Sequence, residues 1–242
     1  MNAFFQGIFY NLKGLRMSMR TPRLLILGLV RFVILALITA AAAALVLMKF
    51  QDILDLVWVR PESLWIVWLW HLTSWLLALV LLGISAVIGF LVAQVLFSVF
   101  IMDMMSQITE RKMTGTIRKA GERPWHRQFF YLLRQEIPRA VLPVLISLVL
   151  LVTGWFTPLG PVVTVAASLL AVLFLAWDNT DLTPARRLTP FSERVAFLRR
   201  HLGFHLGFGV LFLVPGFNIL LLSFAPVGGT LFHLEKIDPQ KG

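Results

Sequence analysis

Long runs of apolar residues, separated by short charged segments, dominate the chain. Four intervals contain no Asp, Glu, Lys or Arg: residues 32–48, 63–102, 140–177 and 201–234. A helix needs about 20 apolar residues to cross the ~30 Å hydrocarbon core of a bilayer, and these intervals approach or exceed that length. The pattern therefore predicts an all-α integral membrane protein, not one that merely rests on the membrane surface.

The first two apolar runs predict two long transmembrane helices, over residues 24–48 and 63–105. The first would be about 37 Å long, enough to span the membrane with some tilt. The second begins with clustered tryptophans, which are typical of the membrane interface, and contains no proline. Because such a helix would extend about 60 Å, its inner half is expected to leave the bilayer or to be covered by protein.

The last two apolar runs predict shorter helical hairpins, over residues 140–177 and 202–234. A turn that begins at Pro158 divides the first into arms of marginal length. A break at Pro215 leaves the second with an arm of about 18 Å, too short to cross the core. We expect both hairpins to penetrate partly and return to the same side. Irregular backbone at that depth needs surrounding protein, so we also expect a homo-oligomer.

The charged segments indicate which side of the membrane each part occupies. Lys plus Arg number 22 against 12 Asp plus Glu, a net charge of +10. The cations gather before the first long helix, in the segments 106–139 and 178–201, and in the C-terminal tail. The positive-inside rule places all four groups in the cytoplasm, and both termini with them. The balanced segment 49–62 is left as an exported loop.

The N-terminal residues 1–22 alternate apolar positions with Lys13, Arg16 and Arg20 at roughly helical spacing. This pattern predicts an amphipathic helix in the interface, with its cations toward anionic lipids. The alternative is an ordinary cytoplasmic segment that precedes the first long helix. Together with the helices and hairpins, this segment completes a single membrane domain over residues 1–242.

Arginines near the first long helix are the strongest candidates for a functional role. Arg31 lies inside an apolar run, where a guanidinium costs at least ~2.5 kcal/mol, so it either serves a function or snorkels to the head groups. Arg20 and Arg23 flank the helix start, where free N–H groups and the positive dipole end favour anions. Glu136 and Arg139, at the start of the first hairpin, are expected to form a gating or structural pair.

The sequence contains no set of residues typical of catalysis or metal binding. The chain has no cysteine. His201 and His205 are four residues apart and could share a helix face, but two histidines alone rarely form a metal site. No phosphate-binding glycine loop is present. We therefore expect no enzyme activity, no metal, no cofactor and no nucleic-acid partner. The polar residues 178–181 are interpreted as a structural turn, with an ion entrance as the alternative.

Several stretches of the chain occur in an order and spacing that resemble one membrane protein family. These stretches are Leu91 to Gly115, Gln135 to Arg139, Pro158 to Pro161, Ala176 to Asp181 with Thr189 to Phe191, and Leu206 to Leu234. Together they resemble the CysZ sulfate permeases, which belong with the etoposide-induced membrane protein family.

This resemblance implies a bacterial inner-membrane protein that assembles into an oligomer and takes up sulfate for cysteine synthesis. It also implies two long helices and two partly penetrating hairpins, without an ATPase or an obligatory cofactor. In this family a small, an apolar and one or two arginine residues near the first long helix are associated with the anion. One register starts at Pro22 and Arg23 and lacks the matching arginine. Another, which requires an insertion, runs from Gly28 to Arg31 and keeps one.

Inward conduction of a small oxyanion, sulfate above others, is the function we expect, with Arg31, Arg23, Arg20 and Gly28 near the anion. The alternative is a non-transporting scaffold that organises lipids or partner proteins. Its basic face would hold anionic lipid at about 1 kcal/mol for each cation. A membrane-embedded enzyme ranks third, because no nucleophile, base or metal set converges.

Overall fold

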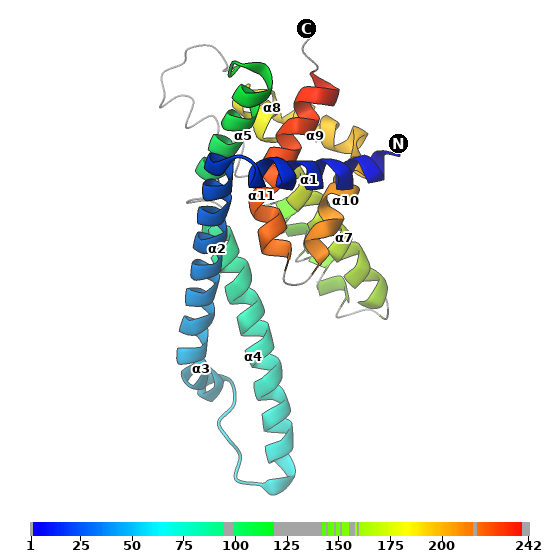
Figure 1. Ribbon diagram of the computed structural model, residues 1–242. Coiled ribbons are helices and arrows are strands. Elements are labelled where there is room, and N and C mark those ends of the chain that lie inside the picture. Colours follow the sequence, from blue (N-terminus) through cyan, green and yellow to red (C-terminus); the bar gives the residue numbers. More distant parts are fainter. Residues whose placement is uncertain are drawn as a thin grey trace. The chain divides into compact units, whose positions relative to one another are not determined.

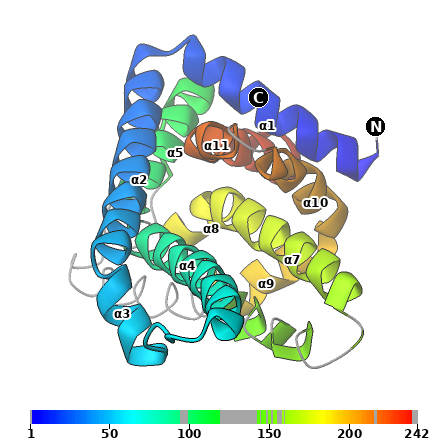
Figure 2. The ribbon, with the colours of Figure 1, turned by 90° about the horizontal axis from the view of Figure 1, so that it is seen from below.

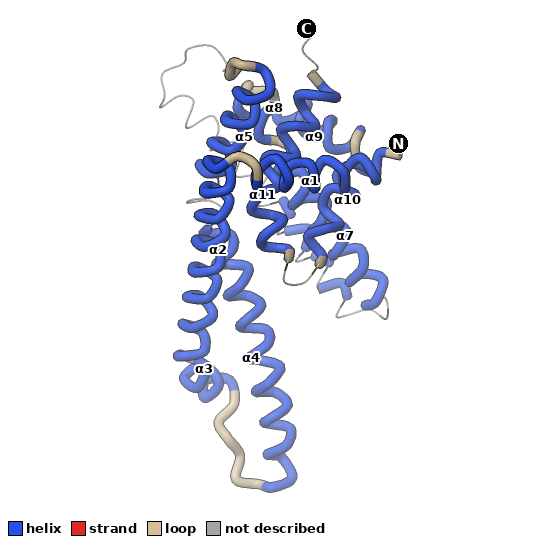
Figure 3. The backbone as a smooth tube through the Cα atoms, in the orientation of Figure 1, coloured by secondary structure: helices blue, strands red, loops and turns tan. Residues whose placement is uncertain are grey.

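The computed structural model is built from helices (Figure 3). Within the residues it describes there is no strand, and three helices are long and apolar enough to cross a membrane. The prediction of an all-α membrane protein is therefore confirmed. The described residues are 2–93, 99–118, 142–143, 145–147, 149–150, 152–154, 158, 160–214 and 217–238.

The chain divides into two compact units. The larger unit combines Met1–Leu29 with Ile101–Gly242, and the smaller unit is Val30–Phe100. Helix α2 (Pro22–Met48) begins in the larger unit and continues into the smaller one. The two units are described separately below.

The smaller unit is built from most of α2 and from α4 (Leu64–Ala93), which run in opposite directions (Figure 1). Their apolar spans have mean hydropathies of 2.6 and 2.2. A Cβ atom at Gly89 would lie 3.3 Å from Cβ of Ala42, so a glycine allows these helices to approach closely. Two long, apolar helices of membrane-spanning length are thus present where the sequence predicts them.

The connection between α2 and α4 contains a short helix that the sequence does not reveal. The segment 49–62, expected as an exported loop, contains α3 (Phe50–Val57), with Leu54 buried. The indole Nε1 of Trp70 donates a hydrogen bond of 2.9 Å to the carbonyl oxygen of Trp58. This bond fixes the end of the connection against the first turns of α4.

The structure describes two helical elements where one helix is predicted over residues 63–105. Helix α4 belongs to the smaller unit and α5 (Val99–Thr114) lies almost wholly in the larger one, while residues 94–98 lie outside the described part. Met102, Met105 and Glu110 on α5 are buried within protein. The expectation that the inner half of this segment is covered by protein agrees with that burial.

The second arm of the first hairpin is longer than predicted. We expect it to end at residue 177, before the first acidic residue, but α7 (Gly160–Thr180) continues for 21 residues, or about 31 Å. Asn179 donates to the carbonyl of Leu175 at 2.8 Å, and Thr180 to that of Trp177 at 3.2 Å, so the polar side chains are satisfied within the helix. By length and composition α7 is a third candidate membrane span.

The second hairpin has the short arms that the sequence predicts. Helix α10 (Leu202–Val210) and the 3₁₀ turn η2 (Leu211–Leu213) form the first arm, and α11 (Asn218–Phe232) forms the second. Residues 215–216 at the break lie outside the described part. Helix α11 spans about 22 Å, and most of it is buried by protein. Its partial penetration of the membrane stays a prediction.

Helix α1 (Ala3–Met19) lies across both arms of this hairpin (Figures 1 and 2). The contact is made by small residues, because a Cβ atom at Gly7 would collide with the backbone of Phe204 and one at Gly14 with that of Gly228. Asn11 adds a hydrogen bond of 2.8 Å from its Nδ2 to the carbonyl oxygen of Phe208. The predicted amphipathic helix is therefore anchored to protein along its small-residue face.

This contact predicts a strong effect of one added methyl group. Gly14→Ala is expected to lower the free energy of unfolding by about 1–3 kcal/mol, because the backbone of Gly228 cannot yield as a flexible side chain would. Thermal unfolding of the detergent-purified protein measures the change. Gly83→Ala on α4 is the control, since no atom lies within 4 Å of the added Cβ. Equal melting temperatures for the two variants would contradict this view of α1.

Candidate anion site

Three cations are present around the start of α2. The N-terminal helix ends at Met19, and Pro22 opens α2 with a ring that suits the first helical position. Arg20 and Arg23, on either side of this junction, are both exposed. Lys112 at the end of α5 adds a third cation, because its Nζ donates a hydrogen bond of 2.7 Å to Oγ1 of Thr21.

This junction has the chemistry to attract an oxyanion. The first turn of a helix presents N–H groups and about half a positive charge from the helix dipole. Arg20 and Arg23 add full charges that are accessible to solvent. Sulfate and related anions bind well to such combinations of backbone donors and guanidinium groups. The sequence alone did not identify Lys112, because it lies 91 positions from Thr21.

Two other predicted site residues occupy different surroundings. Gly28 is buried, and the ring of Phe224 lies where its Cβ would be, so the glycine makes room for an aromatic side chain. Arg31, in the smaller unit, is buried with 1% of its surface exposed. Its role as an anion ligand stays a prediction. Glu136 and Arg139, the expected gating or structural pair, lie outside the described residues.

A buried ion-pair network joins α5 to α8 (Leu182–Arg186). Arg186 donates to Asp103 and to Ser106, each at 3.0 Å, and also to Glu110. Arg187 donates to the other Glu110 oxygen at 3.0 Å and to Asp238 at 2.7 Å. The side chain of Glu110 is 1% exposed, so one buried carboxylate accepts hydrogen bonds from two guanidinium groups.

A second buried ion pair connects the end of α7 to α9 (Phe191–Arg200). Arg194 donates to Asp181 through Nε at 2.7 Å and also through Nη2, and both side chains are fully buried. Oγ1 of Thr180 lies 3.0 Å from Nε2 of His205. The structural turn expected over residues 178–181 is in part the last turn of α7. The carboxylate of Asp181, which follows it, pairs with the buried guanidinium group of Arg194.

The C-terminal turn η3 (His233–Ile237) is bonded to the N-terminal helix. Glu235 accepts a hydrogen bond of 3.0 Å from the hydroxyl of Tyr10 and one of 2.6 Å from Lys13. Burial and this bond raise the pKa of Tyr10 to about 12. Three residues after Glu235, Asp238 pairs with Arg187, which lowers the pKa of the Asp238 carboxyl. Members of separate basic segments are thus held together within one unit.

These pairings decide which cations remain available to an anion. Arg186, Arg187 and Arg194 already hold protein carboxylates, and a second anion would have to displace a buried partner. The exposed Arg20 and Arg23 carry no such cost. Among the described residues no three metal-ligating side chains gather. The arrangement therefore supports anion attraction at the start of α2.

Comparison with known proteins places this architecture in a family. Residues 10–232, nearly the whole chain, match the family described as "Sulfate transporter CysZ/Etoposide-induced protein 2.4". The chain belongs to this family. Membership confirms the resemblance carried by the sequence motifs, and it identifies a multi-pass membrane protein of a transporter family. A search of curated proteins finds no match to the CysZ-family chain.

The buried network predicts that Glu110 is required for stability. Glu110→Gln is expected to cost about 3–5 kcal/mol of unfolding free energy, because Arg186 and Arg187 then share a buried site without their common carboxylate. Chemical or thermal unfolding in detergent measures the loss. Asp52→Asn is the matched control: it breaks an exposed pair with Lys49 and should change stability by less than about 1 kcal/mol. Equal effects would show that burial of Glu110 is unimportant.

Proposed function

We propose that the protein conducts a small oxyanion, sulfate above others, into the cell across the bacterial inner membrane to supply cysteine synthesis. The observation that carries the proposal is the group of cations at the start of α2. Arg20 and Arg23 are exposed there, and Lys112 is held beside Thr21. Membership of the CysZ family supports the choice of sulfate.

The proposed orientation places both termini in the cytoplasm. Hydrogen bonds join Lys13 to Glu235 and Arg118 to Asp238, so the N-terminal helix, the segment after α5 and the C-terminal turn lie together. Cytoplasmic segments of membrane proteins are rich in Lys and Arg, as these are. The cations at the start of α2 would then lie at the inner surface, where an inward-moving anion leaves the membrane.

The proposed pathway runs along α2 inside a homo-oligomer. The N-terminal N–H groups of α2 replace part of the hydration shell of the anion, and neighbouring protomers enclose it. Arg31, further along α2, is the proposed ligand within the membrane. Glu136 and Arg139, outside the described residues, stay the proposed gating or structural pair. In this proposal Gly28 acts only by admitting the ring of Phe224.

Removing the three cations tests the site. The combined variant Arg20→Gln, Arg23→Gln, Lys112→Gln is reconstituted in liposomes. It should take up labelled sulfate about tenfold more slowly than the unaltered protein, because electrostatic attraction of the anion to the pathway is lost. Raising the ionic strength should slow the unaltered protein more than this variant. A matched variant removes three exposed cations elsewhere: Arg199→Gln, Arg200→Gln, Lys236→Gln.

Two results would count against the proposal. One is flux of labelled sulfate no greater than that of empty vesicles. The other is equal flux in the two triple variants, which would show that only total charge matters. Arg31→Ala combined with Arg23→Ala tests the intramembrane arginine in the same assay, and undiminished flux would remove both from the pathway.

A second candidate function, a lipid-organising scaffold, is favoured by the outer face of α1. Phe5 and Met19 are 59% and 64% exposed, and Phe9 and Leu12 are also exposed. This face lies away from the small residues that pack on the hairpin, and Arg16 is exposed beside it. Exposed apolar residues next to cations are typical of a helix that lies among anionic lipid head groups.

Site-directed spin labels test whether α1 lies in lipid. Because the chain has no cysteine, Phe5→Cys and Arg16→Cys each give a single labelling site. The label at Phe5 should be accessible to dissolved oxygen and the label at Arg16 to a water-soluble nickel chelate. Water accessibility at both would exclude an interfacial helix. Lipid contact together with no sulfate flux would favour the scaffold over the transporter.

A further inference from the structure

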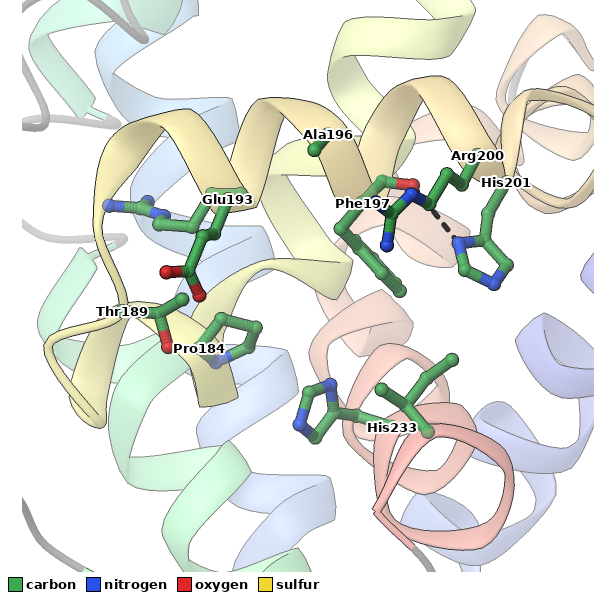
Figure 4. Close-up of a pocket in the computed structure, with 10 residues that line it drawn as sticks. Pro184, Thr189, Glu193, Ala196, Phe197, Arg200, His201 and His233 are labelled. Atoms are coloured by element: carbon green, nitrogen blue, oxygen red, sulfur yellow. Dashed lines mark hydrogen bonds between the residues drawn. The ribbon is translucent and has the colours of Figure 1, made fainter.

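A pocket of about 410 Å³ lies between α8, α9 and the C-terminal turn η3, outside the proposed anion site (Figure 4). Helix α9 forms one wall, Pro184 of α8 forms another, and His233 and Ile237 come from η3. The volume falls within the range of small-molecule sites. All of these elements belong to the larger unit.

One face of α9 presents an acid, an aromatic ring and a base in order. Glu193, Phe197 and Arg200 line the pocket at intervals of four and three residues, the spacing that places side chains on one helix face. Glu193 and Arg200 are two turns apart, about 10 Å along the axis. In Figure 4 Glu193 lies at the end near Pro184, and Arg200 lies at the other end beyond the phenyl ring.

The other cation that lines the pocket is already engaged. Arg194 holds Asp181 in the fully buried ion pair. Arg200 and Glu193, by contrast, are exposed. The pocket therefore has opposite charges at its two ends, separated by the ring of Phe197. A simple anion or a simple cation would satisfy only one end and would face repulsion at the other.

A buried histidine nitrogen lies without a partner beside this space. His233 is 7% exposed, and its Nδ1 has no hydrogen-bond partner among the described residues. Burial, reinforced by Arg187, lowers the pKa of His233 to about 4, so the ring is neutral near pH 7. That nitrogen has no accessible surface, so a ligand in the pocket meets the His233 ring as an uncharged part of the wall and not as a hydrogen-bond partner.

From this geometry we infer that the pocket binds a small dipolar molecule, with an ammonium group toward Glu193, a carboxylate toward Arg200 and an apolar body against Phe197. Short peptides and amino acids with separated charges belong to this chemical class. The uncharged His233 ring forms part of the wall. This inference does not depend on sulfate conduction, since it uses none of the residues at the start of α2.

The test uses three probes of nearly equal size. 4-(Aminomethyl)benzoate carries both charges at opposite ends of a rigid ring, while benzoate and benzylamine each carry one. Ligand-observed NMR with the detergent-solubilised full chain measures the dissociation constants. The dipolar probe should bind about tenfold more tightly than either single-charge probe. Benzoate binding as tightly as the dipolar probe would overturn the inference in favour of a plain anion site, and no binding of any probe would also overturn it.

Variants locate the binding to this pocket. In Arg200→Gln the dipolar probe should bind no more tightly than benzylamine, because the partner of its carboxylate is lost. In Glu193→Gln the dipolar probe should bind no more tightly than benzoate, because the partner of its ammonium group is lost. Arg199→Gln is the matched control, because Arg199 is exposed on the same helix but does not line the pocket. Ala196→Trp, which fills the pocket, should abolish binding while Arg199→Gln leaves it unchanged. Equal losses in the Arg199 and Arg200 variants, or tight binding to Ala196→Trp, would contradict the inference.

Discussion

The larger unit depends on one constraint: a charge placed among apolar helices must be paired before it can be buried. Glu110 meets this constraint by accepting hydrogen bonds from both Arg186 and Arg187. Since an uncompensated buried ion costs several kcal/mol, α5 and α8 are stable in this site only together. Asp238 completes the pairing from the C-terminal turn. Arg187, which donates to both Glu110 and Asp238, thus couples three segments that lie far apart in the sequence.

The same network explains how the candidate anion site is assembled. Once Glu110 fixes α5, Lys112, two residues further along that helix, lies against Thr21 at the start of α2. Helix α1 reaches the same junction because Gly7 and Gly14 allow it to lie directly on the hairpin. The cations therefore divide into those that stabilise the protein by pairing and those, such as the exposed Arg23, that remain available to a ligand.

Features that depend on local sequence were predictable, and features that depend on distant pairing were not. Uninterrupted apolar residues indicated α2, and the break at Pro215 indicated the short arms of the second hairpin. The predicted end of α7 was wrong because an acidic residue was assumed to end the helix, whereas Asn179 bonds within it. No local signal shows that Glu110 meets Arg186, which lies 76 residues away. Lys112 was missed for the same reason.

The distribution of charge also constrains how tightly an anion can bind at the proposed site. If Arg186, Arg187 and Arg194 were free, their guanidinium groups would hold an oxyanion strongly and release it slowly. In this structure these three groups are neutralised by Glu110, Asp181 and Asp238. Attraction at the start of α2 falls instead to exposed cations and to a helix N-terminus, where water screens the charge. Conduction requires an anion to bind strongly enough to enter and weakly enough to be released. Pairing of these three arginines, with only exposed cations left for the anion at the start of α2, therefore suits the proposed conduction better than tight anion binding.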